Sequence, residues 1–234
     1  MKTSGAVALV TGANRGLGAS FCRALLDRGA AKVYAGVRDI DAVRMDHVIP
    51  VQLDITSAAE IAAATESCGD ITLLINNAGI LNGRSVLSDD ALELGRHEFE
   101  TNVFGTLATS RAFVPVLGAN GGGAIINVLS VLSWIASPGA ALYCASKAAA
   151  WSLTNTLRLE LLTQRTHVMA LHVGLMDTDM SAGLQAPKVS PDEVAEFALD
   201  GLEAGAFEVL ADDASRRVRG ALGLDLKALY PVLS

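Results

Sequence analysis

Short apolar runs alternate with longer amphipathic stretches along the whole chain. Strands are predicted for the apolar runs at 6–10, 32–37, 48–53, 71–75, 124–129, 168–173 and 207–210. Helices are predicted where apolar residues recur three and four apart, at 17–28, 57–66, 98–117, 142–162 and 191–202. Continuous apolar runs are typical of strands buried on both faces. The alternation therefore predicts an α/β fold with a doubly wound, mostly parallel sheet flanked by helices, in one domain over residues 1–234.

Composition narrows the class of protein. The chain has 18 Lys+Arg and 25 Asp+Glu, a net charge of −7, which argues against a nucleic-acid or anionic-membrane partner. No apolar run approaches the roughly 18 residues of a membrane span. The polar start at 1–5 is too short for a signal peptide. We therefore expect a soluble, cytoplasmic protein with a small-molecule partner.

Cysteines and histidines do not predict a metal site. Cys22, Cys68 and Cys144 are scattered without ligand spacing, so we expect them to be reduced core residues. His167 and His172 lie five apart on a strand-like run, which places them on opposite faces of the sheet. They cannot jointly bind one metal ion.

The glycine-rich segment 11–18, Thr-Gly-Ala-Asn-Arg-Gly-Leu-Gly, lies between the first predicted strand and the first predicted helix. Glycines let the backbone turn sharply and let a pyrophosphate come close. The free amide groups and the dipole of a helix N-terminus favour the anion. Glycine-rich turns are common, but this position favours a dinucleotide site over a plain turn.

Tyr143 and Lys147 lie four apart on a predicted helix, so their side chains share one face. A free tyrosine has a pKa of about 10, and a nearby ammonium favours the phenolate. Ser130, at a strand end, offers a hydroxyl to a substrate oxygen. Each residue alone has an ordinary interpretation, at a core edge, on the surface or in a turn. Together with the glycine-rich segment they favour catalysis.

These segments resemble the short-chain dehydrogenase/reductase superfamily in type and in order. The similarity covers about residues 6–180 and comprises T-G-x-x-x-G-x-G at 11–18, Asp54, Asn-Asn-Ala-Gly at 76–79, Asn102, Ser130, Tyr143-x-x-x-Lys147 and Gly174-x-x-x-Thr178. The resemblance implies a Rossmann-type domain and an oxidoreductase that interconverts a carbonyl and an alcohol by hydride transfer.

The resemblance also implies a role for each catalytic position. Tyr143 is the proton donor or acceptor, and Ser130 orients and polarises the substrate oxygen. Lys147 lowers the tyrosine pKa and binds the nicotinamide ribose, and Asn102 holds a water that extends the proton relay. The implied cofactor-binding residues are Gly12, Asn14, Arg15, Gly16, Leu17, Gly18, Arg38, Asp54, Ile55, Asn77, Ala78, Gly79, Tyr143, Lys147, Gly174 and Thr178.

The end of the second strand bears on the choice between NADP and NAD. An acid there would bind a ribose 2′-hydroxyl, whereas arginine accepts a 2′-phosphate. Positions 36–37 carry Gly-Val and are followed by Arg38, and Arg15 adds a second guanidinium. We therefore expect NADP, with NAD as the alternative if Asp39 occupies the acidic position.

The sequence departs from the family in two places. Val173 replaces the proline that usually begins the turn before Thr178, which leaves φ unfixed there. The stretch 180–191 is short, which predicts an open cleft. Candidate wall residues are Leu81, Leu132, Trp134, Ile135, Met176 and Leu184, and their apolar character predicts an apolar or aromatic carbonyl substrate.

Two further expectations concern assembly and the alternatives to catalysis. The helices at 98–117 and 142–162 carry apolar residues on more than one face, and their family counterparts often pair between subunits, which implies a homodimer or homotetramer. A non-catalytic dinucleotide-binding redox sensor and a structural subunit remain alternatives. The intact Ser130, Tyr143 and Lys147 count against the sensor, and the intact glycine-rich segment counts against the structural subunit.

Overall fold

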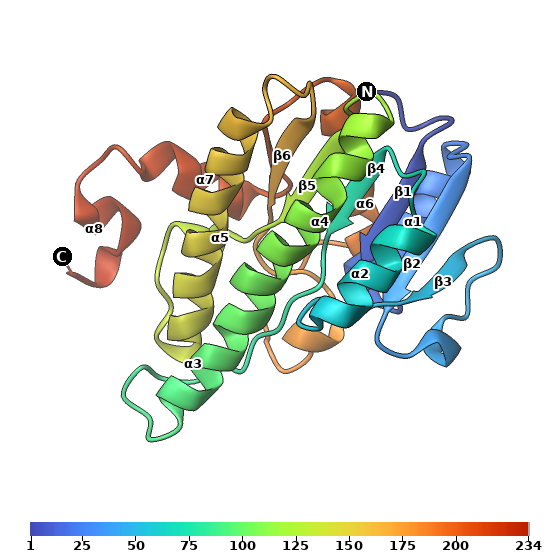
Figure 1. Ribbon diagram of the computed structural model, residues 1–234. Helices are drawn as coiled ribbons and strands as arrows, with labels where there is room; N and C mark the ends of the chain where they lie inside the picture. Colours follow the sequence, from blue (N-terminus) through green and yellow to red (C-terminus); the bar gives the residue numbers. More distant parts are fainter. Residues whose placement is uncertain (234) are drawn as a thin grey trace.

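The computed structural model of the chain describes residues 1–233 and contains one seven-stranded parallel sheet (Figure 1). The strand order is β3-β2-β1-β4-β5-β6-β7, so the order reverses between β1 and β4. The strands are β1 (Val7–Thr11), β2 (Lys32–Val37), β3 (Ile49–Gln52), β4 (Leu73–Asn76), β5 (Ala124–Val128), β6 (His167–His172) and β7 (Glu208–Leu210). The predicted doubly wound α/β fold is confirmed, and each predicted run overlaps a strand.

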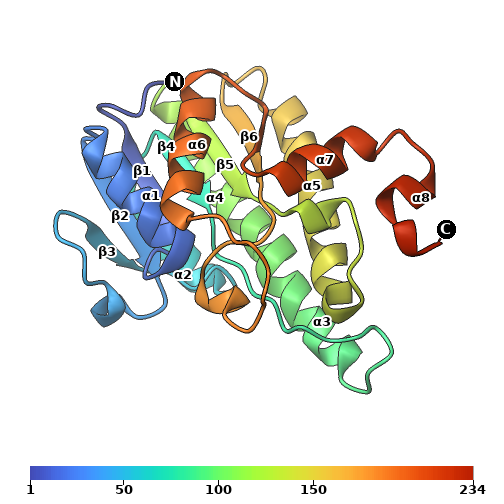
Figure 2. The same cartoon turned by 180° about the vertical axis from the view of Figure 1, so that it is seen from behind.

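Helices cover both faces of the sheet. They are α1 (Gly16–Asp27), α2 (Ala58–Ser67), α3 (Ala91–Phe99), α4 (Thr106–Ala119), α5 (Ala141–Glu160), α6 (Pro191–Glu203), α7 (Asp213–Ala221) and α8 (Leu226–Leu229). In Figure 1, α2, α4 and α5 lie in front of the sheet, and Figure 2 shows α1 and α6 on the opposite face. Within residues 1–233, no helix is both long enough and apolar enough to cross a bilayer.

The core consists of two apolar layers that share the strands. Ala8 and Val10 of β1 belong to the layer under α1 and α6, whereas Leu9, between them, belongs to the layer under α2 and α4. Both faces of the strand are therefore buried, which explains its continuous apolar run. Burial of one such large side chain contributes about 1.5–3 kcal/mol. The three cysteines are buried and unpaired within the described part of the chain, as predicted.

The structure differs from the prediction in two helical regions. The predicted helix at 98–117 begins earlier, at Ala91, and is interrupted by a π-helical turn at Glu100–Gly105. A π turn is frequent near functional sites. The helix α7 was not predicted. Asp212 precedes it, and its carboxylate accepts a hydrogen bond from the Ser215 amide, so this side chain fixes where the helix begins.

Candidate functional site

A large cleft lies at the carboxyl ends of the strands. Its volume is about 1340 Å³, larger than the roughly 300–1,000 Å³ of typical small-molecule pockets. Its walls are the segments that follow β1, β2, β3, β4, β5 and β6, together with the start of α5. The cleft therefore spans the point where the strand order reverses, the usual ligand position in open parallel sheets.

The glycine-rich segment forms one end of this cleft. Gly12 and Gly16 have φ values of +65° and +52°, which favour glycine. A Cβ on Gly18 would lie 2.2 Å from the Gly12 carbonyl oxygen, so α1 approaches the end of β1 as closely as backbone allows. Among residues 1–233, no side chain caps the N-terminus of α1, which leaves its positive end facing the cleft. These features fit the pyrophosphate of a dinucleotide.

Asn77 ties the glycine-rich segment to the end of β4. Its side-chain amide donates to the carbonyls of Thr11 at 2.9 Å and Gly12 at 3.2 Å. The Thr11 hydroxyl oxygen accepts hydrogen bonds from the backbone amides of Asn77 and Ala78, each at 3.0 Å. The two loops on either side of the strand-order reversal are therefore held as one unit.

The structure places nearly all of the expected cofactor residues at the cleft. Fifteen of them line it, namely Gly12, Asn14, Arg15, Gly16, Leu17, Arg38, Asp54, Ile55, Asn77, Ala78, Gly79, Tyr143, Lys147, Gly174 and Thr178. Gly18 lies behind them and serves the close packing of α1. Asp39, His97 and Thr101 also line the cleft.

Two arginines bring positive charge to the cleft. Arg15 forms an ion pair with Asp179, and both side chains are largely exposed. Arg38 lies close enough to Asp54 to affect its ionisation. Burial raises the pKa of Asp54, but hydrogen bonds from Thr56 and the charge of Arg38 together hold it below its usual range.

Ser130, Tyr143 and Lys147 meet at the floor of the cleft. Tyr143 and Lys147 lie on the first two turns of α5, Ser130 follows β5, and all three are buried. Burial raises the pKa of Tyr143, and a hydrogen bond with Ser130 lowers it by less, so the phenol is protonated at neutral pH. Burial lowers the pKa of Lys147 to about 8.

Lys147 bonds the backbone and lies beside the ring of Tyr143. Its Nζ donates to the Val128 carbonyl at 2.9 Å and lies 5.6 Å from the centre of the tyrosine ring. In this structure the contact that lowers the tyrosine pKa comes from Ser130, and the expected role of Lys147 remains a prediction.

Asn102 lies in the π-helical turn and is buried behind the cleft rather than lining it. Its side chain exchanges hydrogen bonds of 2.9 Å with the backbone of Ile80 and donates to the Ser146 hydroxyl at 3.0 Å. These bonds hold the loop after β4 against α5. The Asn102 side chain therefore stabilises the structure here. The expected role of Asn102, to hold a water that extends the proton relay, remains a prediction.

Four of the six expected wall residues, Leu81, Leu132, Met176 and Leu184, line the cleft. Ile135 does not, and Trp134 is turned away from it. The indole of Trp134 stacks on the imidazole of His172, with ring centres 3.8 Å apart. The expectation that Trp134 and Ile135 form part of the wall is therefore wrong, because the 3-10 turn Val131–Ser133 directs Trp134 toward β6.

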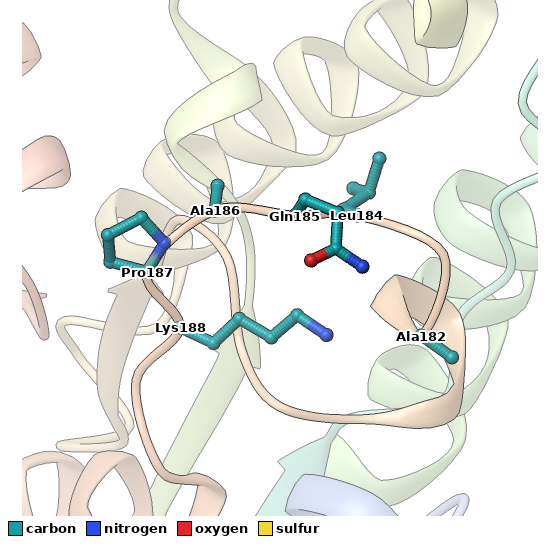
Figure 3. A pocket seen from close by; sticks show the side chains of 6 residues that line it. All are labelled: Ala182, Leu184, Gln185, Ala186, Pro187 and Lys188. Atoms are coloured by element: carbon teal, nitrogen blue, oxygen red, sulfur yellow. The ribbon is translucent and has the colours of Figure 1, made fainter.

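The loop at 182–188 forms an edge of the site. Figure 3 shows Leu184, Gln185 and Lys188 around a small hollow in this loop. Lys188 lies 3.5 Å from the Asp177 carboxylate, and Val189 pairs with Met176 in a short β-bridge. These contacts hold the loop against the turn that contains Thr178.

Asp212 holds the turn in which Val173 replaces the family proline. The Gly174 amide donates to Asp212 Oδ2 at 2.5 Å, while the other carboxylate oxygen caps α7. A Cβ on Gly174 would lie 2.7 Å from the same oxygen, so glycine is required for this approach. Asp212 is absent from the residues expected at the site; the signal it carries in the sequence is that of a favoured helix N-cap residue, which marks the start of α7 and not a contact with Gly174.

We expect Asp212→Ala to weaken cofactor binding about five- to tenfold, because the Gly174 amide loses its charged acceptor. It should also lower the free energy of unfolding by about 1–2 kcal/mol through loss of the cap. Fluorescence titration with NADPH and urea unfolding measure the two effects. Asp225→Ala, which removes the cap of α8 alone, is the control and should leave cofactor affinity unchanged. Equal cofactor affinities in Asp212→Ala and the wild type would contradict the assignment.

Comparison with known proteins bears on this geometry. The family model described as short chain dehydrogenase matches residues 6–188. The chain belongs to the short-chain dehydrogenase family. It is 33% identical, over 232 residues, to the 3-alpha-(or 20-beta)-hydroxysteroid dehydrogenase of Mycobacterium bovis, with 93% of this chain and 86% of that protein covered. The family membership makes the protein an oxidoreductase.

Solved structures of other members share the fold and hold nicotinamide cofactors. A short chain dehydrogenase from Burkholderia cenocepacia J2315, in complex with NADP, is 45% identical with a TM-score of 0.95, covering 100% of this chain and 99% of that one. The 3-ketoacyl-(acyl-carrier-protein) reductase of Brucella melitensis, complexed with NADH, is 26% identical with a TM-score of 0.79, covering 91% and 100%. The match of this chain to these cofactor-bound structures supports dinucleotide binding in the cleft at the carboxyl ends of the strands.

Proposed function

We propose that the protein is an NADP(H)-dependent reductase that interconverts a ketone or aldehyde and its alcohol. The observation that carries the proposal is the buried group of Ser130, Tyr143 and Lys147 at the floor of a cleft whose far end is the glycine-rich segment. A proton donor and a cofactor site thus share one cavity. Placing both reactants in that cavity lowers the entropic part of the barrier.

The side chains divide the chemistry between them. A nicotinamide, when bound, supplies the hydride to the carbonyl carbon. The Ser130 and Tyr143 hydroxyls hold the carbonyl oxygen and stabilise the negative charge that develops on it. Tyr143 then donates its proton to that oxygen, which its raised pKa permits at neutral pH. Lys147, with a pKa near 8, is able to hold a ribose hydroxyl and to return a proton to the phenolate.

The preference for NADP rests on charge at the adenosine end of the cleft. Arg15 and Arg38 line it, and the end of β2 carries no acid before Arg38. Guanidinium pairs bind phosphate through several charge-assisted hydrogen bonds. The NADP complex of the Burkholderia cenocepacia relative supports this preference. Asp39 also lines the cleft and keeps NAD as the second candidate.

The double variant Arg15→Ala/Arg38→Ala is expected to lose roughly 30- to 100-fold in NADPH affinity, because each guanidinium contributes a charge-assisted bond to the 2′-phosphate. Its NADH affinity should stay within about threefold. Parallel fluorescence titrations with the two reduced cofactors measure the change. Arg111→Ala, on the exposed side of α4, is the matched control. If the affinities for NADPH and NADH fall by the same factor, the arginines do not recognise the 2′-phosphate.

The wall of the cleft favours an apolar substrate. Leu81, Leu132, Met176 and Leu184 line the same cleft as Tyr143 and Ser130. The hydroxysteroid dehydrogenase relative carries a name that refers to a large apolar alcohol, which agrees with this wall. We further propose that the chain forms a homodimer or homotetramer through α4 and α5, because Leu159, near the end of α5, and Leu162, just after it, are exposed.

A further inference from the structure

A buried histidine contacts the backbone of Ser130 from the neighbouring strand. His172, the last residue of β6, is fully buried, and its Nδ1 lies 3.2 Å from the Ser130 carbonyl oxygen. A carbonyl oxygen only accepts hydrogen bonds, so Nδ1 carries the proton. The indole of Trp134 stacks on the imidazole ring of His172 with an interplanar angle of 20°.

The surroundings keep the imidazole neutral. Burial lowers the pKa of His172 to about 4, and the charges of Arg219 and Lys147 act in the same direction, whereas the Ser130 carbonyl and Glu208 oppose them. Among residues 1–233, Nε2 has no hydrogen-bond partner, although Glu208 Oε1 lies 3.8 Å away. Glu208 is itself held by Trp151 at 3.1 Å and by Arg219 at 3.1 Å. At neutral pH the ring therefore has one N–H, which it gives to Ser130.

Ser130 lies between two residues whose amides bond the backbone at the end of β6. The amide of Leu129 donates to the Leu171 carbonyl at 2.8 Å, and the amide of Val131 donates to the Val173 carbonyl at 2.9 Å. Between these two backbone bonds, the His172 side chain holds the Ser130 carbonyl. The same carbonyl accepts the Ser133 amide at 2.9 Å, which closes the 3-10 turn. The imidazole thus fixes the backbone from which the Ser130 hydroxyl projects.

We propose that His172 is a positioning residue that holds the Ser130 hydroxyl in place for Tyr143 and the substrate oxygen. It does so through the bond from Nδ1 to the Ser130 carbonyl, and its stack on Trp134 keeps the turn against β6. This inference rests on the proposed function, in which Ser130 and Tyr143 handle the substrate oxygen. A small shift of a catalytic group is enough to slow a reaction, because alignment supplies part of the acceleration.

The test compares two variants of His172. Phenylalanine keeps a ring for the stack but has no donor, whereas asparagine places an amide nitrogen near the position of Nδ1. We expect His172→Phe to lower kcat about tenfold, because one hydrogen bond is lost. Its affinity for NADPH should stay within about twofold of the wild-type value. His172→Asn should recover part of the loss. The upper pKa of the kcat profile should rise in His172→Phe, because the Ser130 bond that lowers the Tyr143 pKa is loosened.

His167→Phe is the matched control. His167 lies on the same strand and also bonds a carbonyl, that of Ala206 at 2.8 Å, but it does not contact Ser130. Its kcat and pH profile should equal those of the wild type. In a Ser130→Ala background, His172→Phe should cause no further loss, because the group through which it acts is gone. A tenfold loss on top of Ser130→Ala, or an equal loss in His167→Phe, would overturn the proposal.

A structural readout separates this inference from the proposed function. Amide hydrogen exchange at residues 130–134 should be faster in His172→Phe than in the wild type and in His167→Phe. If the wild type shows no turnover but exchange rises in this way, the proposed function fails and the positioning contact stands. If the wild type turns over and neither exchange nor kcat changes in His172→Phe, the inference fails alone.

Discussion

Tyr143→Phe is expected to lower kcat for ketone reduction by roughly a thousandfold or more, because one hydroxyl both donates the proton and stabilises the oxyanion. The ring itself is buried and is kept by phenylalanine, so NADPH affinity should stay within about threefold. Steady-state rates of NADPH oxidation and a fluorescence titration measure the two quantities. A loss confined to kcat identifies an interaction made in the transition state.

The control for this variant is another buried tyrosine. The Tyr34 hydroxyl bonds the Asp70 carboxylate at 2.9 Å at the amino end of β2, far from the cleft. Tyr34→Phe removes a comparable hydroxyl and should leave kcat unchanged. A loss of less than tenfold in Tyr143→Phe would show that another group supplies the proton.

Gly18→Ala is expected to weaken NADPH binding by at least about 30-fold and to lower the free energy of unfolding by about 1–3 kcal/mol. The new Cβ would lie 2.2 Å from the Gly12 carbonyl oxygen and 2.7 Å from Asn77 Nδ2. Because α1 then cannot reach the end of β1, its N-terminal amides move away from the pyrophosphate position. Fluorescence titration and urea unfolding measure both effects.

Gly220→Ala provides the matched control. Gly220 lies in α7 with open space around the position of a Cβ, and alanine is the better helix former. It should bind NADPH like the wild type and be equally or more stable. If Gly18→Ala bound NADPH within threefold of the wild type, the close approach of α1 would not matter for the cofactor.

Much of the fold could be predicted because its signals are local. The five inner strands, β2, β1, β4, β5 and β6, are buried on both faces, so a continuous apolar run marks each of them without knowledge of its neighbours. The glycine-rich segment and the Tyr143-x-x-x-Lys147 spacing are also local, and the structure places both at one cleft. The π-helical turn that carries Asn102 could not be predicted, since its sequence continues the helical pattern on both sides.

The contacts that hold the site together are not local and left no pattern in the sequence. Asp212 reaches Gly174 from 38 residues away, and His172 reaches the Ser130 carbonyl from 42 residues away. The orientation of the Trp134 side chain could not be predicted for the same reason. Trp134 follows Ser130 closely in the chain, but the direction of its side chain depends on the fold of the 3-10 turn and on the imidazole beneath it.

The most direct test of the account is the ratio of kcat/KM with NADPH to that with NADH, measured for the wild type on a panel of apolar ketones. We predict NADPH-dependent turnover, with NADPH consumed in step with the alcohol formed and favoured over NADH by at least about tenfold. Binding of NADPH without consumption on any ketone, or an equal or greater kcat/KM with NADH, would contradict it.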